Sequence, residues 1–382
     1  MSWTDVPPEG PCYPRAGMIE IPIELGERRY SVSIGHGLLA LLPDLLGAFA
    51  GRRTVVVSNH RVWSLHGGRV EKGLRRLGPL SRVLIRDGEP HKSRATLEKV
   101  HDALLEAGLG RDGLVVAFGG GVVGDVAGFA AATYMRGVDW VLLPTTLLAM
   151  VDSSIGGKVG VNHPKAKNLL GAFHQPRAVV TDPSLLETLP ARQRRSGGYE
   201  ILKCGVIADR SLVRSVARAP EGLAGWSRID MENAIASACR VKAEVVEKDE
   251  REAGLRRVLN LGHTLGHALE AATGYRRFTH GEAVGWGLVG AAWISRRRGL
   301  LAESSFDAIA AAVDRLGPRP RVSDLEPERV LETLSRDKKA RGGRVPFVLP
   351  TALGRVVIRS DVEQAEIRRA LKVMAAREAR LD

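Results

Sequence analysis

The stretch Leu114-Val-Val-Ala-Phe118 runs directly into Gly119-Gly-Gly-Val-Val-Gly-Asp125, and this junction decides the fold. The apolar run predicts a buried strand, and the glycines let backbone N–H groups approach a phosphate at a helix N-terminus. The glycines match G-x-G-x-x-G, but a tight structural turn would have the same pattern. A Rossmann domain carries this pattern in its first βα turn, whereas at least two β-rich segments come before it here. The pattern alone therefore favours a nucleotide site only weakly.

Short β-rich runs surround this junction and alternate with segments of helical length, such as Ser93 to Ala107. Residues 18–34 contain two alternating stretches joined at Gly26, which predicts an early hairpin. Strands that alternate with helices predict a parallel sheet with crossover helices. The further predicted strands are Thr54–Ser58, Arg82–Ile85, Trp140–Leu143 and Ala178–Thr181.

After about Asp182 the pattern changes, and helical periodicity dominates from Glu221 through Leu316. A last pair of strands is predicted at Val345–Leu349 and Arg355–Ile358. We therefore expect an α/β N-terminal domain with a parallel-sheet nucleotide-binding core at 18–182. We expect a mostly α-helical domain at 183–382 and a tail at residues 1–17.

The chain length and composition agree with two domains, because a chain of 382 residues, 44% of them hydrophobic, exceeds what a single hydrophobic core usually supports. No apolar run is long enough to span a membrane, and residues 1–15 lack a signal-peptide pattern, so we expect a cytoplasmic protein. The cysteines, Cys12, Cys204 and Cys239, lie far apart and form no Cys-x-x-Cys pair, so they indicate neither a disulfide framework nor a thiolate zinc site. A metal must therefore use histidine and carboxylate ligands.

The formal charge of +13 raises the question of nucleic-acid binding. Arginines are scattered and interleaved with acids, aromatic residues make up only 5%, and no nucleic-acid-binding motif occurs. We therefore expect no nucleic-acid partner, and the excess charge instead favours a small anionic substrate.

Polar residues near the glycine-rich turn favour a dinucleotide. Asp125 follows the glycines and could accept hydrogen bonds from a ribose hydroxyl. Thr145 and Thr146 follow the next predicted strand, where they would face the same crevice.

Histidines concentrate in one segment. His263 and His267 lie at i and i+4 on one face of a predicted helix, and His280 follows soon after. Such a pair alone is structural about as often as it is a ligand pair, but the third histidine favours a metal. Without cysteine ligands an open, catalytic type of site is expected. Glu200 could complete it, and its alternative role is that of an acid stabilising a helix N-terminus.

Several cations lie in segments that are otherwise small or apolar. Each one alone is more often a solvated surface charge, and Arg256 could simply pair with Asp249, Glu250 or Glu252. Together they suit an anionic ligand near a metal. The cations are Lys158, Lys167 beside Asn168, Lys203, Lys242, Arg256, Lys338 and Lys339.

Taken together, these strings resemble the 3-dehydroquinate synthase family of sugar phosphate cyclases, in order from about Met18 to Ile358. The motifs that carry the resemblance are Gly119-Gly-Gly-Val-Val-Gly-Asp125, Tyr134-Met-Arg136-Gly, Pro144-Thr-Thr-Leu-Leu-Ala, Asp152-Ser-Ser-Ile-Gly-Gly-Lys158, Lys167-Asn168, Leu259-Asn-Leu-Gly-His-Thr and His280-Gly-Glu-Ala-Val.

The resemblance implies a homodimer that uses NAD and zinc or cobalt and acts on 3-deoxy-D-arabino-heptulosonate 7-phosphate, a phosphorylated sugar acid. It implies that the domain at 18–182 binds NAD and that the helical domain at 183–382 binds the metal and the substrate. It implies transient oxidation, phosphate elimination, reduction and aldol closure. Glu200, His263 and His280 fall on the metal ligands, and His267 falls on a substrate-side position, so the two i,i+4 histidines are not joint ligands. Arg136 matches a residue that reaches the partner subunit.

The resemblance also implies the remaining contacts. Substrate contacts are expected at Asp152, Lys158, Lys167, Asn168, Lys203, Lys242, Arg256, Asn260 and Lys339. Nucleotide contacts are expected at Gly119, Gly120, Gly121, Val122, Gly124, Asp125, Thr145, Thr146, Lys158 and Lys167, with Asn59, Glu89 and Lys92 as weaker candidates.

The chain departs from the family at a few positions: Val159 where Thr is frequent, Lys165-Ala166 where Gly often precedes Lys167, Tyr199 where Ala is usual, and Cys204 where Tyr is frequent. The exact substrate therefore stays open between dehydroquinate synthesis and the cyclisation of an aminated substrate or of sedoheptulose 7-phosphate. A metal-dependent oxidoreductase such as a glycerol dehydrogenase is the alternative of another class.

Overall fold

The computed structural model describes residues 17–219, 222–340 and 345–378, without the side chains of residues 222 and 336–340. The described chain forms two compact units. The first unit comprises the described part of Pro8–Pro190 together with Met231–Arg251, and the second comprises Ala191–Asp230 and the described part of Glu252–Asp382.

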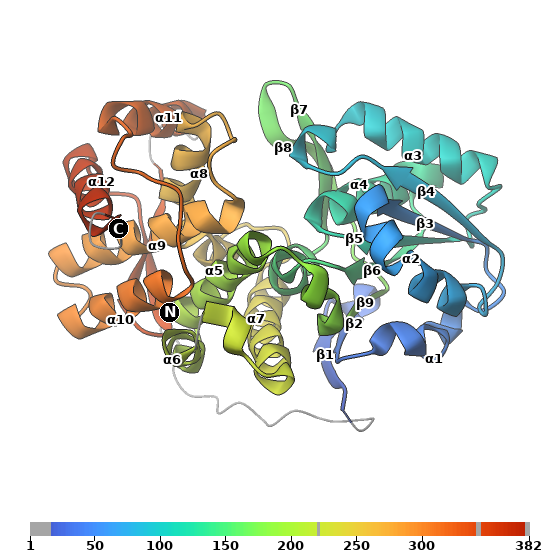
Figure 1. The fold of residues 1–382 in the computed structure, drawn as a ribbon. Helices are drawn as coiled ribbons and strands as arrows, with labels where there is room; N and C mark the ends of the chain where they lie inside the picture. The colour runs from blue at the N-terminus through green and yellow to red at the C-terminus, as the bar shows by residue number, and fades with distance from the viewer. Residues whose placement is uncertain (1–16, 220–221, 341–344, 379–382) are drawn as a thin grey trace. The chain divides into compact units, whose positions relative to one another are not determined.

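The first unit is built on a seven-stranded sheet in the order β1-β2-β9-β6-β5-β3-β4 (Figure 1). Only the β1–β2 pair is antiparallel, and all the other neighbours run parallel. The strands are β1 (Ile19–Ile23), β2 (Tyr30–Ile34), β3 (Thr54–Asn59), β4 (Leu80–Ile85), β5 (Leu114–Gly119), β6 (Asp139–Pro144) and β9 (Ala178–Thr181). The predicted hairpin and parallel sheet are confirmed.

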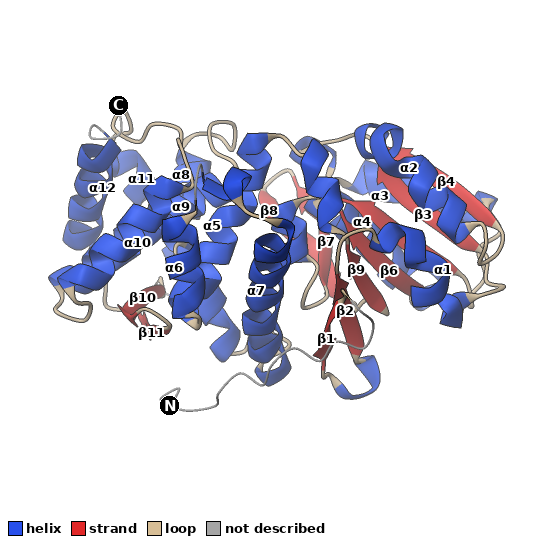
Figure 2. Ribbon diagram, turned by 60° about the horizontal axis from the view of Figure 1, so that its bottom comes forward, coloured by secondary structure: helices blue, strands red, loops and turns tan. Residues whose placement is uncertain are grey.

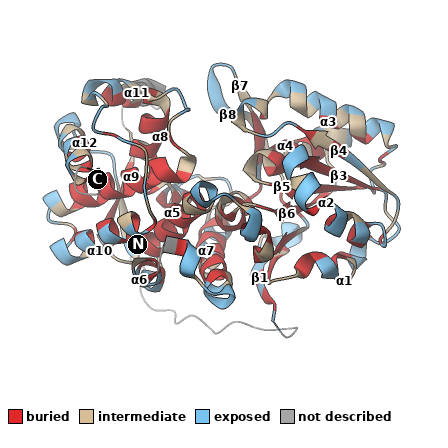
Figure 3. Ribbon diagram, viewed as in Figure 1, coloured by how far each residue is buried: buried red, intermediate tan, exposed pale blue. Residues whose placement is uncertain are grey.

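The helices of the first unit follow the predicted alternation. β5 is buried along its whole length, as its apolar sequence predicts (Figure 3). The helix α4 begins at Gly121, the last of the three consecutive glycines. Ser93 caps the predicted helix, because its side chain accepts the Thr96 N–H. The helices are α1 (Leu42–Leu45), α2 (His60–Leu74), α3 (Arg94–Glu106) and α4 (Gly121–Thr133).

The sequence analysis missed a hairpin of β7 (Lys158–His163) and β8 (Ala166–Phe173), which pair antiparallel as a separate two-stranded sheet (Figure 2). Much of β8 is exposed, so its sequence lacks the apolar run that marks a buried strand.

The second unit is mostly helical and contains the predicted strand pair, β10 (Phe347–Ala352) and β11 (Arg355–Arg359). Its central helix α9 (His280–Arg297) is buried over most of its length. The other helices are α5 (Ala191–Ile207), α6 (Arg210–Arg218), α8 (His263–Ala272), α10 (Glu303–Arg315), α11 (Pro327–Ala340) and α12 (Gln364–Glu378).

One long helix does not follow the linear division predicted at 182/183. Most of α7 (Arg228–Lys248) groups with the first unit, as part of Met231–Arg251. Cys239 of α7 illustrates this packing, since its thiol donates to the Met150 carbonyl at 3.4 Å. The assignment of functional domains by residue range stays a prediction.

In the described part of the chain, no helix combines the length and the apolar character that crossing a membrane requires.

Candidate active site

A carboxylate and two imidazoles converge in the second unit. Nε2 of His263 lies 3.8 Å from Oε1 of Glu200, and Nε2 of His280 lies 3.5 Å from the same oxygen. One potential ligand atom from each of the three residues lies within 4.8 Å of the others. The three residues come from α5, from the first position of α8 and from the first position of α9.

Close helix packing brings His280 to Glu200. A Cβ added to Gly281 would lie 2.0 Å from the Ser196 carbonyl oxygen, so only glycine allows α9 to begin this close to α5. The Gly281 N–H donates to Oγ of Ser196 at 3.0 Å, one helical turn before Glu200. Thr279 and Glu282 form a capping box that fixes where α9 starts.

Glu200 is not an acid at a helix N-terminus, so that alternative is wrong. It is the tenth residue of α5, which begins at Ala191, and it is completely buried. Its second oxygen forms an ion pair with the ammonium of Lys203, which is also buried. A buried carboxylate costs free energy unless charges compensate it, which a cation and a bound metal would do.

The two histidines of the cluster have opposite electrostatic environments. Burial, together with the positive charge of Lys203, lowers the pKa of His263 well below 6.5, which leaves a neutral imidazole suited to metal binding. Burial opposes protonation of His280, but hydrogen bonds and negative charge from Glu200 and Glu270 outweigh it and raise its pKa to about 10. A divalent ion at this cluster would replace that proton.

The donor set fits a catalytic metal. Two imidazoles and one carboxylate are a common protein ligand set of catalytic zinc, which leaves a coordination position for a substrate.

The structure also brings in Glu270, which the sequence analysis missed: its Oε2 lies 3.6 Å from Nδ1 of His280. His263 and His267 belong to different groups of potential metal ligands. His263 lies with Glu200 and His280, whereas His267 lies with Glu270 and His280. The spacing of Glu270 three residues after His267 is the signal that could have found it.

Three of the predicted cations are buried, so the surface-charge alternative is wrong for them. Lys203, Lys242 and Arg256 are 1%, 6% and 3% exposed. Lys158 and Lys167 are exposed, as that alternative expects. The side chains of Lys338 and Lys339 lie outside the described residues.

The remaining substrate candidates occupy different surroundings. In the first unit, Lys242 donates to the carboxylate of Asp152, which lies in a π-helical turn. In the second unit, Nδ2 of Asn260 donates to Oε1 of Glu252 at 3.2 Å. Arg136 is exposed and has a positive φ of 67°.

The nucleotide candidates gather at the carboxyl ends of adjacent strands of the first unit. The chain passes from β3 outward to β4 and returns to β5 on the other side of β3, which makes a topological switch point where such sheets bind ligands. Gly119 ends β5, Gly120 precedes α4 and Gly121 begins it. Val122, Gly124 and Asp125 lie in the first part of α4. The N–H groups of a first helical turn suit an anion because they precede the helical hydrogen bonds, which begin here with the bond from the Gly124 N–H to the Gly120 carbonyl at 3.0 Å.

The threonines and Asn59 lie at the same edge of the sheet. Thr145 follows β6, and its N–H donates to the Gly119 carbonyl at 2.9 Å. Its hydroxyl is buried and has no hydrogen-bond partner among the described residues, as expected of a group that contacts a ligand. Oγ1 of Thr146 accepts the Ala149 N–H, and Asn59 ends β3 and caps α2.

A buried ammonium joins several of these candidates. Lys92 forms an ion pair with Asp125 and donates to the side-chain oxygen of Asn168. Burial raises the pKa of Asp125 above its ordinary value of 3.8, against the lowering effect of Lys92. Oε1 of Glu89 accepts a hydrogen bond from Nδ2 of Asn162 at 2.8 Å.

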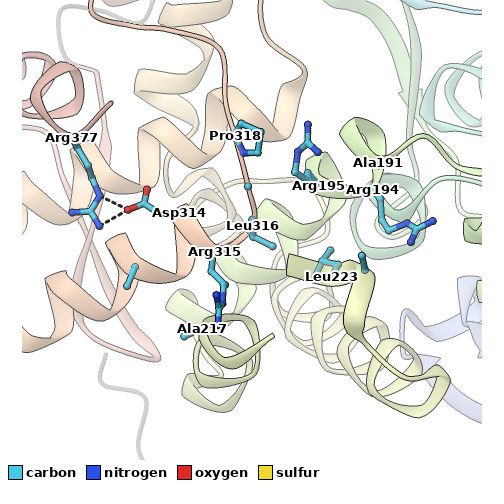
Figure 4. Close-up of a pocket in the computed structure, with 13 residues that line it drawn as sticks. Ala191, Arg194, Arg195, Ala217, Leu223, Asp314, Arg315, Leu316, Pro318 and Arg377 are labelled. Atoms are coloured by element: carbon cyan, nitrogen blue, oxygen red, sulfur yellow. Dashed lines mark hydrogen bonds and ion pairs between the residues drawn. The ribbon is translucent and has the colours of Figure 1, made fainter. Parts of the chain in front are cut away.

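A cavity of about 740 Å³ in the second unit contains none of the predicted site residues (Figure 4). Asp314 pairs with Arg377 at its wall, while Arg194, Arg195 and Arg315 point in different directions. We therefore assign it no ligand.

The first unit combines a parallel sheet with a glycine-rich turn, and the second carries a histidine–carboxylate cluster. These features are typical of enzymes that bind both a nucleotide cofactor and a metal ion. Residues 82–196 match the model of the 3-dehydroquinate synthase N-terminal region, and residues 197–340 match that of its C-terminal region. The chain belongs to the 3-dehydroquinate synthase family.

Relatives of the chain agree with this assignment. The 3-dehydroquinate synthase of Pelotomaculum thermopropionicum is 47% identical over 90% of this chain and 94% of its own. That of a Synechococcus strain is 41% identical over 94% and 99%. The solved structure of ValA, the 2-epi-5-epi-valiolone synthase of Streptomyces hygroscopicus with NAD+ and Zn2+ bound, is 31% identical, covers 93% of this chain and 98% of its own, and has a TM-score of 0.83.

Proposed function

We propose that the chain is a 3-dehydroquinate synthase that converts 3-deoxy-D-arabino-heptulosonate 7-phosphate to 3-dehydroquinate and phosphate. The observation that carries the proposal is the convergence of Glu200, His263 and His280 in a chain of this family. The buried cations Lys203 and Arg256 support it, since they provide positive charge for a doubly anionic sugar.

NAD+ would supply reversible hydride transfer, and a zinc or cobalt ion held by Glu200, His263 and His280 would polarise the substrate as a Lewis acid. The protein residues orient the substrate and compensate its charge. Arg256 offers a bidentate fork to the carboxylate, and Lys158, Lys167 and Asn168 hold the phosphate. Lys203, Lys242, Asn260, His267, Asp152 and Lys339 are assigned to the remaining contacts.

Gly119, Gly120 and Gly121 leave room for the pyrophosphate of NAD+ against the start of α4. A Cβ at Gly120 would lie 3.0 Å from the side chain of Thr146, so larger side chains would crowd this turn. Asp125 and Thr145 would provide polar contacts to the nucleotide.

We further infer that the protein is a homodimer in which Arg136 reaches the partner subunit. Met135 and Arg136 both adopt a positive φ, which is costly for such residues, and Met135 exposes 42% of its surface. Light scattering after gel filtration tests the assembly. The cytoplasmic location expected from the sequence stays a prediction.

The activity is tested with an assay that identifies the product. The purified protein with NAD+ and Zn2+ or Co2+ is given the carboxylated sugar phosphate and, separately, sedoheptulose 7-phosphate. We expect phosphate release and 3-dehydroquinate from the first substrate and little turnover of the second, with no net NADH. Comparable turnover of both sugars would refute the substrate assignment, and accumulating NADH would instead indicate a glycerol dehydrogenase-like oxidoreductase.

A further inference from the structure

Asn162 lies at an irregularity of the β7–β8 hairpin. The strand register shifts between Val161 and His163, which pair with Leu170 and Ala166. Such a shift releases a residue from the regular ladder and redirects its polar groups. The Asn162 N–H accordingly donates outside the hairpin, to the Lys92 carbonyl at 2.8 Å.

The side chain of Asn162 makes three further hydrogen bonds, which point in two directions. Its Nδ2 donates to Oε1 of Glu89 at 2.8 Å and, at 3.5 Å, to the Glu89 carbonyl. Its Oδ1 accepts the Asn168 N–H, also at 2.8 Å. One short amide therefore connects the loop that carries Glu89 and Lys92 to the hairpin segment that carries Lys167 and Asn168.

Asn168 needs such support because its φ of 54° lies in the left-handed region. Its side-chain oxygen accepts a hydrogen bond from the Lys92 ammonium, which also pairs with Asp125. Residues assigned to the nucleotide and residues assigned to the substrate phosphate thus share one connected network within the first unit.

We propose that Asn162 is a positioning residue that holds the Glu89–Lys92 loop and Asn168 in the arrangement that binds NAD+ and the substrate phosphate. This inference rests on the proposed function. Asparagine is required here because the position needs a donor toward Glu89 and an acceptor toward Asn168 on one short side chain. Aspartate keeps the acceptor but places a second carboxylate against Glu89.

The test reverses the direction of the hydrogen bond between the side chains of Asn162 and Glu89. Asn162→Asp alone creates like-charge repulsion, whereas Asn162→Asp combined with Glu89→Gln restores one donor and one acceptor. The variants are compared with Glu89→Gln alone and with His163→Ala, a matched change in the same turn whose ring nitrogen accepts the Lys165 N–H. The measurements are the NAD+ Kd by calorimetry, KM and kcat with the phosphorylated sugar acid, and hydrogen exchange of residues 158–173.

We expect Asn162→Asp to raise the NAD+ Kd and the substrate KM about tenfold, with a smaller change in kcat. The double variant should return to within about threefold of Glu89→Gln, and His163→Ala should stay within about twofold of the wild type. Additive losses in the double variant would overturn the inference, and so would a Kd unchanged by Asn162→Asp.

The hydrogen-exchange measurement separates this inference from the proposed function. If the wild type binds NAD+ but does not turn the sugar over, the proposed function fails and the Kd values of the wild type and the four variants still decide the role of Asn162. If the wild type binds neither NAD+ nor the sugar, the hydrogen-exchange rates of residues 158–173 decide. Faster exchange in Asn162→Asp that is reversed in the double variant supports the positioning role, and unchanged exchange overturns that role.

Discussion

The metal ligands are best tested one side chain at a time. His263→Ala removes one of the three proposed ligands, so we expect metal occupancy and kcat/KM to fall together. Metal content by mass spectrometry and steady-state kinetics measure both quantities. His101 of α3, a partly exposed histidine that interacts with Thr133, provides the control, since His101→Ala should keep full occupancy. Full occupancy in His263→Ala would exclude it as a ligand.

Arg256 is the residue on which the assignment of a carboxylated substrate depends most. Arg256→Ala should lower kcat/KM for that substrate by about 10- to 100-fold, because a charge-assisted hydrogen bond contributes about 1.5–3 kcal/mol. Arg257→Ala is the matched control, as Arg257 is the exposed neighbour in the same turn. Circular dichroism of both variants separates lost binding from lost folding. An unchanged kcat/KM with Arg256→Ala would remove this residue from the site.

At the scale of elements, glycines on α9 determine how close the helices come. Gly287 faces the Gly262 carbonyl, where an added Cβ would lie at 1.9 Å, and Gly285 faces the ring of Tyr199. Tyr199 stands where the family usually has alanine, and Gly285 leaves room for its larger ring, whose hydroxyl donates to the Gly317 carbonyl at 3.2 Å. The ring of Tyr199 is therefore accommodated by packing against α9, beside the proposed ligand Glu200.

The start of α9 gives a prediction about this packing. Gly281→Ala should lower the free energy of unfolding by about 1–3 kcal/mol and weaken metal binding, because α9 must shift away from α5. Gly68 of α2 is the helical control, since an added Cβ there meets no atom within 4 Å. Gly68→Ala should leave stability unchanged or raise it by about 1 kcal/mol. Urea unfolding and metal titration measure both effects, and equal stability of the two variants would contradict the packing argument.

At the scale of the whole molecule, the proposed metal site predicts that metal binding is coupled to folding of the second unit. A ligand that binds only the folded state stabilises it by about 2.7 kcal/mol at 100 times its Kd. Removal of the metal with a chelator should therefore lower the Tm, and Zn2+ or Co2+ should restore it. Hydrogen exchange should increase mainly in α5, α8 and the start of α9, which carry the ligands. Loss of protection confined to the first unit would contradict a metal site at Glu200.

The sequence by itself determined the strand and helix order, the glycine-rich turn and the family, because these follow from local patterns of apolar residues and from motifs. Tertiary structure decided which side chains meet. The meeting of Glu200 with His263 and His280, and of Asn162 with Glu89, depends on contacts between residues distant in sequence. Glu270 meets His280 through the packing of α8 against α9, and the β7–β8 hairpin is local but has an exposed strand without an apolar run. Periodicity reports only which face of an element is apolar, so it carries no information on such contacts.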